Sequence, residues 1–370
     1  MPFLYFDSVF LPMTLSALGW NDCFAQHFQP FSASDFLPAR VARAHKHACE
    51  VFLGAELVPA ACTGRMLHDT ATRAALPAVG DWVVVRLRTG ERRADIHAVL
   101  PRRTQFSRRA AGPLAEEQVI AANLDTVLLL TALDGNYNLR RIERYLTLAR
   151  DSGAQPVVVL NKTDLHPDPA AAVAETVAIA AGAPVVALSA SHGDGLDRLA
   201  PWLTPGSTLA LLGSSGVGKS TLINRLLGAD QQSTTALSTA VNKGRHTTTR
   251  RELFVTPGGA LVIDTPGMRE LQFWDPPAEA VGDTFADISA LAAQCRFHDC
   301  RHATEPGCAV LAALNEGTLG EDRWQSFLKL QREQAYAARQ ADPHLARANR
   351  DAWKKIYRGV RARMRLESGE

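Results

Sequence analysis

The sequence predicts a multidomain protein with an N-terminal β-barrel of the OB-fold type, a central α/β domain and a C-terminal, mostly helical domain that holds a metal. Three observations lead to this prediction. Short β-rich runs punctuated by glycine fill residues 40–112, and longer apolar runs alternate with helical patterns over residues 113–275. Three cysteines and a histidine crowd into the otherwise helical segment 276–370. Residues 1–39 are expected to form an N-terminal extension.

The composition is that of a globular protein. Of the 370 residues, 46% are hydrophobic and 21% are charged, which excludes a disordered chain, a collagen-like chain and a disulfide-stapled miniprotein. No apolar run reaches the roughly 18 residues that a membrane span requires. The apolar start carries Asp7 but no Lys or Arg, so it lacks the basic region of a signal peptide. We therefore expect a cytoplasmic, monomeric protein with no membrane partner.

The charge is small in sum but uneven along the chain. The formal net charge is +2. Residues 86–109 hold eight arginines against two acidic residues, a net of +6, and residues 321–370 hold twelve Lys or Arg against seven acidic residues, a net of +5. The remainder therefore carries −9. Two basic blocks beside an acidic remainder indicate a nucleic-acid partner, although each block alone could be an ordinary solvated face.

The first basic block lies in the predicted barrel. Residues 40–112 contain short strand-like runs separated by turn signals. Five short strands in roughly 70 residues suit the OB-fold, which binds oligonucleotides in many proteins. We therefore expect an RNA-binding barrel here, with basic residues on its surface.

The central domain has longer apolar runs than the predicted barrel. Apolar runs of buried-strand type lie at residues 125–133, 156–160, 184–190, 207–212 and 260–264, with a helical pattern at 139–153. Because strands buried on both faces read as nearly continuous apolar runs, this alternation predicts a mostly parallel sheet covered by helices on both faces.

The most specific motif follows the fourth apolar run, between a predicted strand and a predicted helix. It matches the phosphate-loop pattern and consists of Gly213, Ser214, Ser215, Gly216, Val217, Gly218, Lys219, Ser220 and Thr221. Its backbone N–H groups would surround the phosphates, Lys219 would reach the β- and γ-phosphates, and Ser220 would bind Mg²⁺. Asp264 ends the fifth run and would hold the same Mg²⁺ through water, while the Gly267 N–H would contact the γ-phosphate.

A second motif after the 156–160 run predicts recognition of guanine. It consists of Asn161, Lys162, Thr163 and Asp164. A carboxylate at Asp164 accepts from both N1–H and the amino group of guanine, a donor pair that adenine lacks. Asn161 would bond near N7 or tie the loops together, the Lys162 stem would lie along the base, and Ser189-Ala190 would offer a backbone N–H to O6. This pattern also occurs by chance at turns, but beside a phosphate loop it predicts a GTPase.

The motifs come in an unusual order. In ordinary small GTPases the phosphate loop comes first and the guanine motif last, whereas here the guanine motif at 161–164 precedes the phosphate loop and Asp264. The sequence therefore predicts a circularly permuted GTPase domain, which can form the same sheet because domain termini are often close together. The segment after Gly267 leads into the C-terminal domain, so hydrolysis of GTP to GDP could move that domain.

A long polar stretch at residues 231–250 is interpreted as switch I. One hydroxyl among residues Thr247, Thr248 and Thr249 should complete the Mg²⁺ shell. Ras-like enzymes position the attacking water with a glutamine where this chain has Met268. His246 is the nearest candidate in sequence to orient the water, and the alternative is an exposed loop histidine. We expect slow intrinsic hydrolysis.

The C-terminal cluster predicts a structural zinc site. It supplies three thiolates and one imidazole, from Cys295, Cys300, His302 and Cys308. This set suits a closed tetrahedral Zn²⁺ site that holds together a lobe with little core of its own. His298 is a less favoured substitute for His302, and free thiols are the alternative to a site. Cys23, Cys49 and Cys62 lack such neighbours and are expected to be ordinary buried or half-buried thiols.

Taken together, these motifs resemble the RsgA family (also called YjeQ or YloQ), bacterial GTPases that assist maturation of the small ribosomal subunit. The resemblance runs from about residue 15 to 320 and rests on residues 18–22, the segment 102–109, the nucleotide motifs, residues 244–249 and the Cys/His cluster. It implies that His246 is the catalytic histidine of switch I, that Thr248 is the Mg²⁺ ligand and that the hydrophobic Met268 replaces glutamine.

The resemblance also implies a function. It points to binding of the 30S subunit and its 16S rRNA, to hydrolysis stimulated by the subunit and to release controlled by the nucleotide. Two alternatives stay open, namely a GTP-gated RNA-binding module in which hydrolysis is incidental and a regulatory switch that binds a protein partner. The two basic blocks favour rRNA over a protein partner, because neutralisation of phosphates dominates such affinity.

Overall fold

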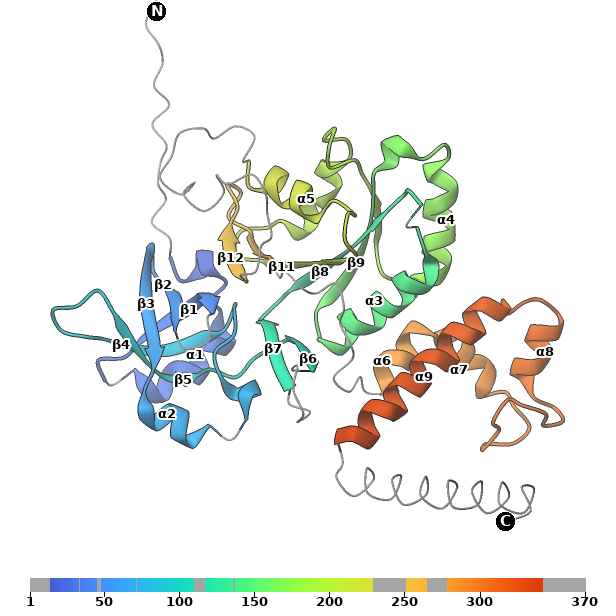
Figure 1. Ribbon diagram of the computed structural model, residues 1–370, viewed down its shortest axis with the longest axis horizontal. Coiled ribbons are helices and arrows are strands. Elements are labelled where there is room, and N and C mark those ends of the chain that lie inside the picture. The colour runs from blue at the N-terminus through green and yellow to red at the C-terminus, as the bar shows by residue number, and fades with distance from the viewer. Residues whose placement is uncertain are drawn as a thin grey trace, which may run out of the picture. The chain divides into compact units, whose positions relative to one another are not determined.

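The computed structural model describes residues 14–32, 34–44, 48–70, 72–109, 117–135, 137–228, 251–264 and 278–341. These residues form a barrel, a largely parallel sheet and a helical lobe, in the order that the sequence predicts (Figure 1). The barrel and the sheet belong to one compact unit, and the helical lobe belongs to another. The expected switch I and the expected basic helix at residues 345–365 lie outside the described residues.

Five strands close the N-terminal barrel. They are β1 (Leu37–Ala44), β2 (Cys49–Leu53), β3 (Glu56–Cys62), β4 (Trp82–Leu87) and β5 (Ala94–Val99). The pairing order is β1-β2-β3-β5-β4 and the barrel closes through β4 and β1, with β3 and β5 parallel. Helix α2 (Gly64–Asp69) connects β3 to β4. This five-stranded barrel confirms the predicted OB-like fold. Its first strand begins at Leu37, within the segment that we expected to precede the barrel.

Small and β-branched side chains fill the barrel. The fully buried members are Ala39, Val41, Val51, Val83, Val85 and Ile96. They alternate along their strands with residues that face outward, as expected for a closed sheet with one interior face. Cys49 is buried among them and Cys62 is half-buried, whereas Cys23 is exposed and so differs from the expectation.

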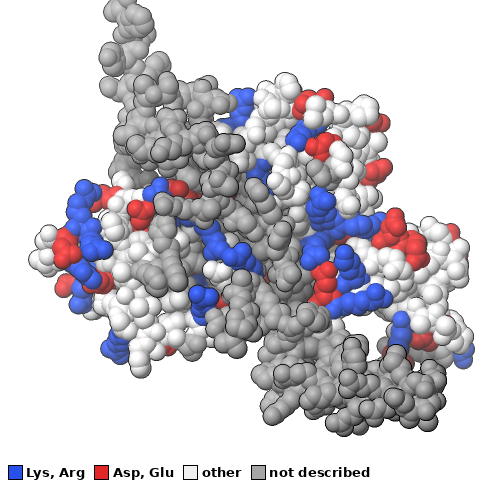
Figure 2. Space-filling model, viewed as in Figure 1, with Lys and Arg blue, Asp and Glu red and all other residues white. Residues whose placement is uncertain are grey.

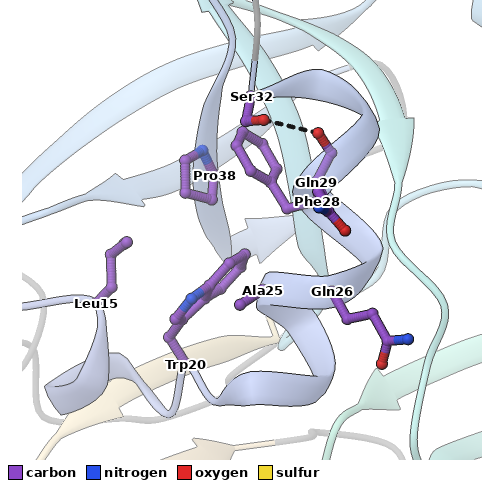
Figure 3. Close-up of a pocket in the computed structure, with 8 residues that line it drawn as sticks. All are labelled: Leu15, Trp20, Ala25, Gln26, Phe28, Gln29, Ser32 and Pro38. Atoms are coloured by element: carbon purple, nitrogen blue, oxygen red, sulfur yellow. Dashed lines mark hydrogen bonds between the residues drawn. The ribbon is translucent and has the colours of Figure 1, made fainter.

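An aromatic segment packs onto the outside of the barrel. Helix α1 (Asp22–Phe28) begins after Asn21, whose side chain accepts hydrogen bonds from two backbone N–H groups of the first turn. Phe24 is buried, and the ring of Trp20 meets the ring of Trp82 edge-on with their centroids 4.7 Å apart. A shallow hollow lies beside α1 (Figure 3), lined mainly by Leu15, Trp20, Ala25, Phe28 and Pro38.

The central sheet has the spatial strand order β10-β9-β8-β11-β13-β12. These strands are β8 (Thr126–Ala132), β9 (Gln155–Asn161), β10 (Val185–Ala187), β11 (Thr208–Gly213), β12 (Glu252–Val255) and β13 (Leu261–Asp264). β12 is antiparallel to β13, and the other neighbours are parallel. This arrangement confirms the predicted mostly parallel sheet.

Helices cover both faces of this sheet (Figure 1). Leu128 and Leu130 of β8 pack in one cluster with η5 (Leu196–Trp202) and α5 (Lys219–Leu226). The amphipathic helix α3 (Leu139–Asp151) and helix α4 (Pro169–Ile179) lie on the other face. Because successive side chains of a strand point to opposite faces, both sides of β8 are apolar and both are buried.

The barrel and the sheet share strand β1. Beyond its barrel partners, β1 pairs with β12 at Arg43 and Glu252. The Arg43 guanidinium also forms ion pairs with Glu252 and with Glu50, the latter at 2.7 Å. Strands β6 (Gln105–Arg109) and β7 (Glu117–Ala122) form a separate two-stranded pair between the two parts in sequence.

A buried guanidinium joins the same two parts. Arg40 of β1 is 1% exposed and donates to acceptors in four segments, which are the carbonyls of Leu18, Gly80 and Asn123 and the hydroxyl of Thr208. Burial lowers the pKa of Arg40 to about 10, which leaves it protonated at neutral pH. Because buried polar groups are costly without partners, Arg40 satisfies carbonyls that would otherwise be orphaned.

The helical lobe consists of α6 (Ala278–Thr284), α7 (Ala286–Ala292), α8 (Ala309–Asn315) and α9 (Glu321–Ala341). Its described core is small, with Phe285, Ile288 and Val310 fully buried. Arg323 fixes α9 to α7 through an ion pair with Asp287 at 2.7 Å. Among the described residues, no helix combines the length and the apolar character needed to cross a bilayer.

Replacing Arg40 by methionine should lower the free energy of unfolding by about 2–4 kcal/mol, because several buried acceptors lose their donor. Urea unfolding followed by tryptophan fluorescence measures the change. The matched control is Arg65→Met on α2, whose side chain is 91% exposed and which should change stability by less than about 0.5 kcal/mol. Equal stability of the Arg40→Met variant and the parent protein would show that these carbonyls do not depend on the guanidinium.

Candidate functional site

The nucleotide motifs predicted from the sequence meet at one edge of the sheet. β9 ends at Asn161, β11 ends at Gly213 and β13 ends at Asp264. These strands run parallel, so their carboxyl ends lie on the same side. Open α/β sheets bind ligands at this edge. The structure therefore gathers the predicted guanine motif, the phosphate loop and the predicted Mg²⁺ acid at one place.

The phosphate loop turns sharply from β11 into α5. Gly216 and Gly218 have φ angles of 80° and 97°, in the region that L-residues rarely adopt. A Cβ atom at Gly218 would also overlap the Nδ2 atom of Asn161, whereas one at Gly216 would meet nothing within 4 Å. Val217 is buried between them. The glycine at position 218 therefore allows the loop to pass close to the guanine motif.

Cations and exposed hydroxyls line this loop. Lys219 Nζ donates to the carbonyl oxygens of Gly213 at 2.6 Å and Ser214 at 2.7 Å. Arg141 of α3 donates to Ser214 Oγ at 3.2 Å. Ser215, Ser220 and Thr221 are exposed. Two guanidinium or ammonium groups beside a helix start make this edge favourable for phosphate.

Asn161 connects three of the predicted motif segments. Its Nδ2 donates to the carbonyl of Val217 at 2.8 Å, and its Oδ1 accepts from the Ala190 N–H at 2.9 Å. The side chain is buried, so both bonds are made away from water. Of the two roles predicted for Asn161, the structure contains the tie between loops. The Ala190 N–H, which we expected to face guanine O6, donates to Asn161 here.

Asp164 is held by the second guanine segment. Ser189 Oγ donates to Asp164 Oδ1 at 2.5 Å, and His192 Nδ1 lies 3.7 Å from Asp164 Oδ2. The Ser189 hydrogen bond, the largest cause, keeps the pKa of Asp164 below its ordinary value. An ionised carboxylate is an acceptor only, which is the form that pairing with the two guanine donors requires. Thr163, the residue before Asp164, donates its backbone N–H to the Leu188 carbonyl at 3.3 Å.

Two further side chains support the site and were missed by sequence reasoning. Asp134 accepts from Lys162 Nζ at 2.8 Å, and Arg225 donates to the carbonyls of Ala190 at 3.1 Å and Ser191 at 2.6 Å. Asp134 directly follows the β8 region at the same sheet edge, so its position after a strand could have indicated it. Arg225 lies within α5 and has no signal in the sequence.

The other predicted residues fall into two groups. Asp264 is the last residue of β13 and is in register with Glu252 of β12. His246, Thr248, Gly267 and Met268 lie outside the described residues.

The Cys/His cluster of the helical lobe brings four possible metal ligands together. Its four ligand atoms, from Cys295, Cys300, His302 and Cys308, lie within 4.8 Å of one another. The Sγ atoms of Cys295 and Cys308 are 3.8 Å apart, and His302 Nδ1 lies 3.5 and 3.4 Å from them. Tetrahedral zinc, with bonds of about 2.3 Å to sulfur and 2.0–2.1 Å to nitrogen, separates such ligands by about 3.8 and 3.5 Å. His298 is not part of the cluster.

Helix α8 supports this cluster at its start. Cys308 caps the helix, with its Sγ accepting from the Leu311 N–H at 3.4 Å. Burial raises the pKa of the Cys295 thiol, but hydrogen bonds from the N–H groups of Ala309 and Val310 bring it below its ordinary value. The surroundings therefore favour the thiolate, the form that binds metal, at Cys295. Burial and the neighbouring cysteines raise the pKa of Cys300 to about 11.

Comparison with known proteins decides the family. The small ribosomal subunit biogenesis GTPase RsgA of Opitutus terrae is 65% identical to this protein over 96% of this chain and 99% of its own length. The protein belongs to the RsgA family. The protein of the same name from Syntrophotalea carbinolica is 46% identical over 97% of this chain and all of its own, and the RsgA GTPase family model matches residues 99–274.

Solved structures of RsgA-family proteins share the fold. YjeQ from Thermotoga maritima matches with a TM-score of 0.59 at 27% identity, covering 81% of this chain and 99% of its own. YloQ, described as a circularly permuted GTPase, has the same fold, with a TM-score of 0.56 over 81% of this chain and 95% of its own. These matches confirm the predicted family, the permuted GTPase fold and the activity of a GTP hydrolase.

Alanine substitutions at the two loop glycines should separate backbone strain from the contact with Asn161. Gly216→Ala should cost about 1–2 kcal/mol of stability from its positive φ alone. Gly218→Ala has the same strain and in addition displaces the Asn161 carboxamide, so it should cost about 2 kcal/mol more and abolish measurable GDP binding. Thermal unfolding without nucleotide and calorimetric GDP titration measure both effects. Equal losses in the two variants would contradict the close approach at position 218.

Proposed function

We propose that the protein hydrolyses GTP at this sheet edge and couples hydrolysis to late maturation of the small (30S) ribosomal subunit, with 16S rRNA as its partner. The observation that carries the proposal is the Asn161 carboxamide, which joins the guanine motif to the phosphate loop. The carboxamide thereby holds the guanine motif beside the phosphate loop, as the binding of a single nucleotide requires. The biogenesis role rests on the names of the Opitutus terrae and Syntrophotalea carbinolica relatives.

Guanine selectivity belongs to Asp164. Its carboxylate accepts from guanine N1–H and the amino group, while the Ser189 hydroxyl keeps it ionised and oriented. Adenine lacks this donor pair, so it would leave the carboxylate without the two hydrogen bonds that guanine supplies. Lys162 lies along the base, and its ammonium is fixed by Asp134. Arg225 holds this segment through the Ala190 carbonyl. The Ala190 N–H donates to Asn161 and would have to exchange that bond to reach guanine O6.

The phosphates lie on the loop from Gly213 to Thr221. Backbone N–H groups surround the α- and β-phosphates, and Lys219 exchanges its bonds to the loop carbonyls for the β- and γ-phosphates. Ser220 and Thr248 would be the direct ligands of Mg²⁺, and Asp264 would hold it through water. When bound, the ion neutralises charge that develops on the transferring phosphoryl group.

Hydrolysis requires a group that orients the water. The chain has Met268 at the position of the usual glutamine. We assign this role to His246, with Gly267 contacting the γ-phosphate. A histidine in this role acts only when it is positioned against the attacking water. We therefore expect slow turnover by the isolated protein and acceleration by the ribosomal subunit.

The cluster of Cys295, Cys300, His302 and Cys308 holds one structural Zn²⁺. All four ligands come from the protein, which leaves no open position for catalysis. The distances among Cys295, His302 and Cys308 suit tetrahedral zinc. The small described core of the lobe leaves much of its stability to the metal. The protein acts in the cytoplasm as a monomer.

The rate of GTP hydrolysis, measured with and without purified 30S subunits, tests this function. The isolated protein should be slow, and subunits should accelerate it by roughly 10²–10³-fold. His246→Ala should abolish the accelerated rate and leave GTP affinity within about twofold, because histidine touches the water rather than the nucleotide. Absence of stimulation would reject the proposed function, and tight GTP-dependent subunit binding without hydrolysis would favour a GTP-gated RNA-binding module.

Removal of the metal should unfold the helical lobe. Cys300→Ser should lose bound zinc, measured by elemental analysis, and abolish the cooperative unfolding transition of α6–α9, because much of the folding energy of such lobes comes from the metal. The matched control is Cys23→Ser, whose thiol is exposed and outside the cluster. It should keep the zinc and the transition. Full zinc content in the Cys300→Ser variant would reject the proposed ligand set.

A further inference from the structure

The charged side chains on the visible face do not gather into one further site. Figure 2 shows that Lys and Arg occupy several separate parts of this face rather than one continuous patch. Four arginines of the block at 86–109 form ion pairs with carboxylates, namely Arg88, Arg92, Arg102 and Arg103. A more informative feature lies beside the guanine motif, where a histidine outside every predicted motif contacts the side chain that holds Asp164.

That histidine is His192, which follows the segment 189–191. Its Nδ1 lies 3.1 Å from Ser189 Oγ, and its backbone N–H donates to the same oxygen at 3.4 Å. Ser189 is fully buried, whereas 61% of the His192 side chain is exposed. The distance of 3.7 Å from His192 Nδ1 to Asp164 Oδ2 is too long for a direct hydrogen bond. The imidazole therefore reaches the carboxylate through the Ser189 hydroxyl.

The directions of these hydrogen bonds follow from the single hydroxyl hydrogen of Ser189. Ser189 Oγ donates that hydrogen to Asp164 Oδ1 at 2.5 Å, so toward its other neighbours the oxygen only accepts. For the 3.1 Å contact to be a hydrogen bond, His192 Nδ1 must carry a hydrogen and donate it. Ser191 Oγ, 3.1 Å away, can donate to the second lone pair of Ser189 Oγ. Donation thus runs from His192 through Ser189 to Asp164.

This chain of donors affects how Asp164 faces a base. A hydroxyl that accepts a hydrogen bond is polarised and becomes a better donor, and its rotation is restricted. Asp164 needs both carboxylate oxygens in the plane of guanine to accept from N1–H and from the amino group. Ser189 holds one of these oxygens, so its own position fixes the direction in which the other faces.

We propose that His192 is a positioning residue that sets the preference of the nucleotide site for guanine over bases without the 2-amino group. The inference rests on the proposed function, because it requires that Asp164 accepts from guanine. His192 acts through Ser189 and not by contact with the base. Hypoxanthine has N1–H but no 2-amino group, so it uses only one of the two bonds that depend on the carboxylate orientation. Loss of the His192 donor should therefore weaken guanine binding more than hypoxanthine binding.

The test measures calorimetric Kd values for GDP and for inosine diphosphate (IDP) with His192→Ala and His192→Asn. His192→Ala should bind GDP roughly three- to tenfold more weakly, the effect of one lost hydrogen bond. Its ratio of the IDP Kd to the GDP Kd should fall about threefold, because IDP loses less. Asparagine places an amide N–H close to the position of Nδ1, so His192→Asn should restore most of the parent ratio.

A control histidine and a stability measurement separate positioning from structural support. His68→Ala changes a side chain on α2 that is 90% exposed, and it should keep the parent values for both nucleotides. His192→Ala should leave the Tm of the nucleotide-free protein nearly unchanged, because its side chain is mostly exposed. A Tm lower by several degrees, or an asparagine variant as impaired as the alanine variant, would overturn the proposal.

A double substitution tests the route through Ser189. Ser189→Ala alone should weaken GDP binding, and adding His192→Ala should weaken it no further, because the chain of donors is already broken. Additive losses in the double variant would overturn the proposed route.

Failure of the inference differs from failure of the proposed function. A parent-like ratio in His192→Ala, with GDP still preferred, would overturn the role of His192 and leave guanine recognition by Asp164 in place. A parent protein that binds IDP or ADP as tightly as GDP would instead refute the guanine assignment on which the inference rests.

Discussion

The site depends on one buried carboxamide. Asn161 bonds the Val217 carbonyl of the phosphate loop and the N–H of Ala190, two segments that come from different crossovers of the sheet. The guanine motif ends at Asp164 and the phosphate loop begins at Gly213, so no short connection sets their spacing. The side chain of Asn161 does so instead, and Gly218 leaves the space in which it fits. Parallel strands bring the loops to one edge, and the carboxamide fixes their separation.

Much of this arrangement was accessible from the sequence, for physical reasons that particular elements illustrate. β8, β9 and β11 are buried on both faces, so they appear as apolar runs that need no knowledge of their neighbours. The phosphate loop is specified locally, since a strand, a turn of glycines and a helix follow one another. The spacing of the predicted zinc ligands is equally local, since His302 and Cys308 are only six residues apart in the sequence. Features of this kind could be predicted together with the family.

The features that were not predicted come from contacts between distant residues. Arg40 contacts Thr208, which is 168 residues away, and nothing near Arg40 in the sequence marks it as buried. In the sequence, Arg225 resembles any basic residue of an amphipathic helix. Only the structure shows that it donates to the Ala190 carbonyl. The basic block at 86–109 was predicted to form an RNA-binding surface, yet Arg102 forms an ion pair with the buried Asp81. The net charge counts every charged residue, whereas binding of an anion depends on which basic residues have no partner within the protein.

Strand β1 closes the barrel and also pairs with β12 of the sheet, and Arg40 on the same strand bonds acceptors in both parts. The OB-fold is usually regarded as a module that can be exchanged among proteins. Here one strand serves two folds, so a foreign barrel would leave a sheet edge and several buried carbonyls without partners. A chimera that replaced residues 37–99 would have to reproduce Arg40 and the β1 edge as well. This barrel and this nucleotide sheet are therefore structurally interdependent rather than separate modules.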